Sequence, residues 1–105
     1  MKAHILGCVV LLGVSMVPAI AGPTEGKEVY GTKCKTCHGD SGQGNPGLAK
    51  MMKVELRPLG SKEVQAQSDA DLKKIITEGK GKMKPIAGLS AKQVDDVVAF
   101  VRTLK

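Results

Sequence analysis

The sequence predicts an all-α fold of three to five short helices joined by long loops. Two segments carry the 3.6-residue apolar spacing of amphipathic helices, one beginning after Ser68 and the other after Ser90. No segment alternates apolar and polar residues as a half-buried strand would. The connecting stretches are rich in glycine and proline, which favour irregular loops. With 105 residues, the chain forms at most one small domain.

The first helix is expected from about Thr24 to Lys33. The Thr24 hydroxyl can cap its N-terminus, and Glu25 and Glu28 place negative charge near that end, where the helix dipole favours it. The stretch from Gly39 to Gly47 that follows is dense in glycine, serine, asparagine and proline, so a loop is predicted there.

A short helical turn is then expected from Leu48 to Lys53, well before Pro58. The next helix should begin at Ser68 and end at Gly79, a residue type that commonly ends helices. Its apolar face consists of Leu72, Ile75 and Ile76. The glycines and proline of residues 79–85 predict a loop after it.

The last helix has the strongest local signals. Ser90 and Gln93 form a capping box, and Leu89 and Val94 occupy the positions of a hydrophobic staple. The apolar residues that then repeat at helical spacing are Val94, Val97, Val98, Val101 and Leu104. This helix should therefore bury one face in the core.

Residues 1–21 are predicted to be a cleaved secretory signal peptide. Lys2 supplies the positive charge, residues 5–17 are apolar, and Ala19-Ile20-Ala21 forms an A-x-A cleavage site. The apolar stretch is shorter than the roughly 20 residues of a spanning helix. We therefore expect a periplasmic protein without a stable membrane span after cleavage, with an uncleaved N-terminal anchor as the alternative.

The mature domain, residues 22–105, contains Cys34-Lys35-Thr36-Cys37-His38. Cys-x-x-Cys-His is the attachment signature of c-type haem. Two thiols three residues apart fall on one side of a helical turn, where each can form a thioether with a porphyrin vinyl group. His38 then lies under the macrocycle, where a ring nitrogen can bind iron. The pattern predicts one covalently attached haem c, around which the helices and loops wrap.

Two alternative functions of this cysteine pair have less support from the sequence. A thiol–disulfide oxidoreductase uses Cys-x-x-Cys, but its fold needs strands and βαβ units, which the sequence lacks. Structural zinc needs four ligands. Once His4 and Cys8 leave with the signal peptide, the strong ligands that remain are Cys34, Cys37 and His38.

The formal net charge of +6 comes mainly from lysines spread along the chain. A basic surface steers association with acidic partners. Nucleic acid is not expected as a partner, because the chain is predicted to be exported and its aromatic residues are limited to Tyr30 and Phe100. We expect a monomer that docks acidic redox proteins, such as larger respiratory or dehydrogenase complexes.

From about Thr24 to Leu104, the chain resembles the small bacterial class I monohaem cytochromes c. The resemblance rests on the first helix, the Cys-x-x-Cys-His sequence, the glycine-rich loop, a methionine shortly before a proline, and the amphipathic last helix. It implies the cytochrome c fold, in which the first and last helices cross at a small residue. By this resemblance Gly26 and Tyr30 would meet Val97 and Phe100.

The resemblance leaves the sixth ligand of iron to be chosen among the mature chain's methionines. Met83 is the expected ligand, because it lies in a loop 45 residues after His38 and is followed closely by Pro85. Met51 and Met52 follow His38 too closely to reach the opposite haem face easily, and methionine on a short helix is often core filler. The alternative is that the Met83 side chain only packs within its loop and does not bind iron.

Further residues are implied by the resemblance. A carbonyl near Pro46 would accept the second ring N–H of His38, since ligating histidines normally donate that hydrogen. Arg57 resembles the basic residues that face haem propionates, although a solvated arginine is an equal alternative. With His38 and Met83 both bound, iron has no open position, so the expected function is electron transfer and not enzyme catalysis. The alternative is a haem subunit or ligand-binding haem domain of a larger oxidoreductase.

Overall fold

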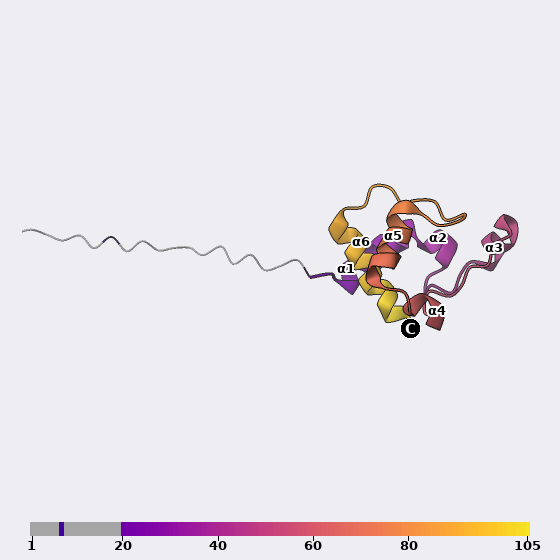
Figure 1. Cartoon of the computed structure of the whole chain (residues 1–105), viewed down its shortest axis with the longest axis horizontal. Coiled ribbons are helices and arrows are strands. Elements are labelled where there is room, and N and C mark those ends of the chain that lie inside the picture. Colours follow the sequence, from indigo (N-terminus) through magenta and orange to yellow (C-terminus); the bar gives the residue numbers. More distant parts are fainter. Residues whose placement is uncertain (1–6, 8–19) are drawn as a thin grey trace, which may run out of the picture.

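The computed structural model describes Gly7 and residues 20–105, and this part of the chain is helical without a strand. Its helices are α1 (Pro23–Lys33), α2 (Lys35–His38), α3 (Pro46–Met52), α4 (Lys62–Gln65), α5 (Asp69–Glu78) and α6 (Ala91–Val101), and α6 continues into a 3₁₀ turn, Arg102–Leu104 (Figure 1). The all-α prediction is confirmed. Four helices are longer, and α2 and α4 are single turns of four residues.

Most of the predicted signal peptide, including Cys8, lies outside the described residues. Among the residues that are described, no helix has both the length and the apolar character needed to cross a membrane.

Helices α1 and α6 lie side by side and cross at a glycine (Figure 1). Gly26 of α1 is buried, and a Cβ added to it would collide with the Asp96 carbonyl oxygen and lie 3.0 Å from the Val97 nitrogen. One turn later, the rings of Tyr30 and Phe100 pack with their centroids 4.9 Å apart. The crossing implied by the resemblance is thus confirmed.

The start of α1 differs from the prediction that Thr24 caps it. The N-cap is Gly22, which lies in an extended conformation and has no side chain to cap the helix. Pro23 occupies the first helical position, which suits its fixed φ and missing N–H. Thr24 therefore lies inside the helix, and the Gly22 N–H is bound by a distant side chain, Asp96 Oδ1, at 2.7 Å.

The connecting region contains more helix than predicted. Helix α3 begins at Pro46 instead of Leu48, because the Asn45 side chain accepts a hydrogen bond from the Leu48 N–H and caps it. It ends at Met52, and the C-cap Lys53 has a φ of 55°. Helix α4, which the sequence did not indicate, is capped by Ser61. In Figure 1, α3 lies at the far edge of the fold, away from α1 and α6.

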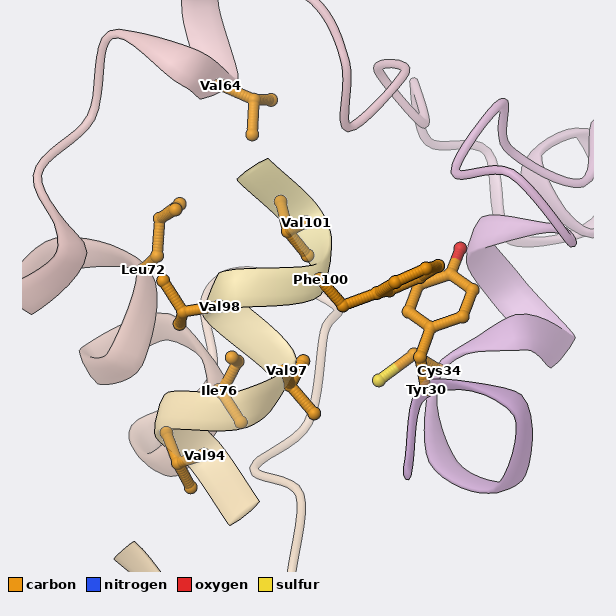
Figure 2. Close-up of a cluster of buried hydrophobic side chains, with 10 residues drawn as sticks. All are labelled: Tyr30, Cys34, Val64, Leu72, Ile76, Val94, Val97, Val98, Phe100 and Val101. Atoms are coloured by element: carbon orange, nitrogen blue, oxygen red, sulfur yellow. The ribbon is translucent and has the colours of Figure 1, made fainter. Parts of the chain in front are cut away.

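Helices α5 and α6 have the predicted ends. Ser68 accepts a hydrogen bond from the Asp71 N–H, and α5 ends before Gly79. The predicted capping box of Ser90 and Gln93 is present at the start of α6. The apolar face of α6 packs against α1 on one side and α5 on the other, and forms the core drawn in Figure 2.

Candidate haem site

A cavity of about 440 Å³ lies beside the core. Its lining is mostly apolar and comes from α1, α2, α4, α5, α6 and the loops at residues 55–59 and 80–83. This volume is within the range of roughly 300–1,000 Å³ that is usual for small-molecule and cofactor sites. Cys34, His38 and Met83, three of the four predicted haem-binding residues, line it.

Cys34 joins two helices, since it is both the C-cap of α1 and the N-cap of α2. It is 8% exposed, and its sulfur points toward α6 (Figure 2). The Cys34 carbonyl accepts hydrogen bonds from the N–H groups of Cys37 (3.3 Å) and His38 (3.0 Å), so all three residues share one turn. Both cysteines are free thiols.

Burial, reinforced by the neighbouring Cys37, raises the pKa of Cys34 to about 11. Thiol–disulfide oxidoreductases need the opposite, a cysteine whose pKa is lowered so that the thiolate can attack. In addition, no group of three or more His, Cys, Asp or Glu residues in the described ranges could hold a metal ion. The raised pKa of the buried Cys34 thiol disfavours the redox-thiol alternative.

Cys37 lies in α2 and lines a second, smaller cavity of about 190 Å³. Met52 and Met83 line the same cavity. The two cavities therefore meet around Met83, with Cys34 on one and Cys37 on the other.

His38 ends α2 and is partly buried at the larger cavity. Burial lowers its pKa, which favours the neutral imidazole that metal binding requires. Its Nδ1 atom is buried and has no hydrogen-bond partner within the described residues, so the predicted bond to a carbonyl near Pro46 is absent. Pro46 is instead the first residue of α3, and the adjacent Asn45 side chain caps that helix.

Met83 sits in a tight loop after α5. The Lys80 N–H donates to the Met83 carbonyl at 2.9 Å, and the Met83 N–H donates to the Lys80 carbonyl at 3.0 Å. Gly79 and Gly81 adopt positive φ values of 80° and 57°, which glycine allows without strain. A Cβ on Gly79 would lie 2.5 Å from the Met83 carbonyl oxygen, so the loop folds back closely on itself there.

The other methionines occupy different environments. Met51 is 73% exposed and lines neither cavity, whereas Met52 lines the smaller one. Arg57, the residue compared with propionate-facing side chains, lines the larger cavity.

Sequence reasoning missed several cavity residues. Lys80 lines both cavities, and Leu56 does so too. Leu59 and Gln67 also line the larger one. They lie outside regular helices, so no periodic pattern indicated them; for Lys80, closeness to Met83 in the sequence was the available signal.

These residues fit a c-type haem. The larger cavity offers an apolar wall, a neutral imidazole and a thioether sulfur, and the thiols of Cys34 and Cys37 lie on one turn, Cys34 at this cavity and Cys37 at the smaller one. The buried, unpartnered Nδ1 of His38 is the kind of polar atom that calls for an explanation such as a bound group.

Comparison with known proteins agrees with this site. The family described as "Cytochrome C oxidase, cbb3-type, subunit III" matches residues 21–101. Among solved structures, the KustC0563 c-type cytochrome is similar with a TM-score of 0.66 and 32% sequence identity, over 76% of this chain and 96% of that chain. No curated protein matched. The chain therefore belongs to the small c-type cytochromes of the cbb3-type subunit III family, whose haem transfers electrons.

Proposed function

We propose that this protein is a periplasmic carrier of single electrons between larger redox proteins. Cys34 and Cys37 would hold one haem c through thioethers, and His38 and Met83 would be the axial ligands of its iron. The observation that carries the proposal is that His38 and Met83, 45 residues apart in the chain, line the same apolar cavity as Cys34. When bound, haem supplies reversible one-electron chemistry.

The protein side chains would tune and protect that chemistry. Neutral His38 would coordinate iron through a ring nitrogen, and the Met83 sulfur would favour the reduced state and raise the reduction potential. The apolar side chains of α5 and α6 would shield a bound haem from water on the side that they line. Because both axial positions would be filled, no position remains for a substrate, and the expected role is that of a carrier and not an enzyme.

The lysines beside the cavities support the proposal that the redox partner is acidic. Lys80 lines both cavities and Lys82 the smaller one, and both are exposed, as is Lys84. Such lysines would attract carboxylates of a redox partner to the region where Met83 lies. We expect the carrier to be a monomer that binds these partners transiently and does not bind nucleic acid.

The first test is the absorption spectrum of the full-length gene product, made with a periplasmic cytochrome c maturation system. We expect haem that stays with the protein after denaturation, a low-spin spectrum, and the weak near-red band of ferric iron bound to methionine sulfur. A high-spin spectrum that changes with carbon monoxide would reveal an open iron position and overturn the carrier proposal.

A second test concerns docking. Because exposed charges are screened by salt, the rate constant for electron exchange with an acidic blue-copper protein should fall roughly tenfold between low and physiological ionic strength. Lys80→Gln and Lys82→Gln should each weaken this dependence. Lys62→Gln, at an exposed lysine of α4 that lines neither cavity, is the matched control. A rate that does not change with salt would refute docking by charge.

The second candidate function is a haem subunit of a larger oxidoreductase. The description of the matched family, a subunit of a cbb3-type oxidase, favours it. The two functions differ in what is recovered from native cells. A carrier elutes alone from the periplasmic fraction at the mass of a small monomer, whereas a subunit co-purifies with a large complex.

A further inference from the structure

Asp96 is the buried charged residue of the described core, with 2% exposure. Its Oδ1 accepts a hydrogen bond from the Gly22 N–H at 2.7 Å, and its Oδ2 accepts one from Lys92 Nζ at 2.8 Å. Gly22 precedes α1 and Asp96 lies in α6, 74 positions later. The carboxylate therefore ties the beginning of the first helix to the last one.

The nitrogen that Asp96 binds is the atom that the predicted cleavage would release. Hydrolysis of the Ala21–Gly22 peptide bond consumes one water, leaves a carboxylate on Ala21 and turns the Gly22 amide into an ammonium group. Ile20 is 78% exposed, and Ala21 is also exposed and outside α1. The bond thus marks the boundary between an accessible segment and the packed helix.

The charges around this nitrogen favour an ammonium group. The carboxylate of Glu25 lies against Gly22, so closely that a Cβ on Gly22 would collide with it. Before cleavage, Asp96 and Glu25 both place negative charge near the Gly22 nitrogen, and Lys92 donates its hydrogen bond to Asp96. After cleavage the Gly22 ammonium would add a positive charge beside these carboxylates, and the existing hydrogen bond to Asp96 would then join two opposite charges instead of an amide and a carboxylate.

We propose that Asp96 is the receptor for the α-ammonium group that removal of the signal peptide creates at Gly22. Cleavage after Ala21 thereby completes the contact between α1 and α6, and the mature domain is more stable than a chain that extends past Gly22. The hydrogen bond from Lys92, followed by that from the Gly22 N–H, lowers the pKa of Asp96, so the receptor is ionised at neutral pH.

The position of cleavage is tested first. The haem-loaded protein is purified from the periplasm of an expression host, and its intact mass and N-terminal fragment masses are recorded. We expect Gly22 as the first residue. Any other first residue would overturn the proposal, whatever the ligands of the haem iron prove to be.

The receptor itself is tested by a double-mutant cycle on the haem-loaded protein. Thermal midpoints are compared for chains that begin at Gly22 or at Ala21, each with Asp96 or with Asp96→Asn. The one-residue extension moves the ammonium away from Asp96, so it should lower the midpoint by about 5 °C in the presence of Asp96 and have little effect with asparagine there. An equal effect in both backgrounds, or none in either, would refute the receptor role.

Asp95→Asn is the matched control for charge. Asp95 is the neighbouring carboxylate in α6 and pairs with Lys73 at 2.7 Å, on another surface. The effect of the extension should persist in this variant. Should Asp96→Asn fail to fold, acetylation of the Gly22 amine in the wild-type chain keeps the N–H donor and removes the charge. It should lower the midpoint as the extension does, and an unchanged midpoint would contradict the proposal.

Discussion

Replacing Met83 with alanine is expected to abolish the near-red band, open the sixth position of iron to carbon monoxide, and lower the reduction potential by on the order of 100 mV or more. The loop itself should survive. The two hydrogen bonds that link Met83 to Lys80 use backbone atoms, which alanine retains. The measurements are the ferric spectrum, carbon monoxide titration and a redox titration of the purified protein.

Two other methionines serve as controls for this change. Met51→Ala alters a side chain that is 73% exposed and lines neither cavity, so its spectrum and potential should match those of the wild type. Met52→Ala removes one of the side chains that line the smaller cavity, so it should shift the reduction potential modestly while the near-red band is kept. If Met83→Ala retains the near-red band, Met83 is not the ligand and the sixth-ligand assignment is wrong.

Replacing Gly26 with alanine is expected to destabilise the domain by about 3 kcal/mol. The added Cβ would collide with the carbonyl group of Asp96, and a helix backbone cannot rotate away as a side chain would. The two helices would have to separate, which would also loosen the contact between Tyr30 and Phe100. The thermal midpoint should fall by roughly 15 °C, measured by circular dichroism on the haem-loaded protein.

Gly31 provides the comparison within the same helix. A Cβ at this exposed position meets no atom within 4 Å. Gly31→Ala should therefore stabilise α1 by about 0.5–1 kcal/mol through reduced backbone entropy in the unfolded chain. If both glycine variants behaved alike, the close approach at Gly26 would not control stability.

Prediction from sequence worked where structure depends on nearby residues. The side chains of Ser68 and Ser90 accept hydrogen bonds from N–H groups three residues later, so each cap can be recognised from residues within one helical turn. The start of α1 was mispredicted because its N-cap N–H is bound by Asp96, which is 74 positions away. Helix α4 has only four residues, too few to display a period.

In the candidate haem site, too, features set by neighbouring residues were predictable and those set by distant residues were not. The spacing of Cys34, Cys37 and His38 is local, and it is sufficient by itself to indicate haem attachment. The cavity wall was not predictable in this way. Leu59, for example, reaches the cavity through a segment that is held by a hydrogen bond from its N–H to the Gly42 carbonyl at 2.8 Å. Such contacts join residues that carry no common pattern.

The closed loop around Met83 has a consequence for the speed of electron exchange. Its paired backbone hydrogen bonds with Lys80 and the fold-back at Gly79 fix the backbone that carries the Met83 side chain. As the proposed ligand, Met83 would then keep nearly the same position whether the iron is ferric or ferrous. Little nuclear rearrangement would accompany each transfer, and a small reorganisation energy is what allows an electron to move rapidly under a weak driving force.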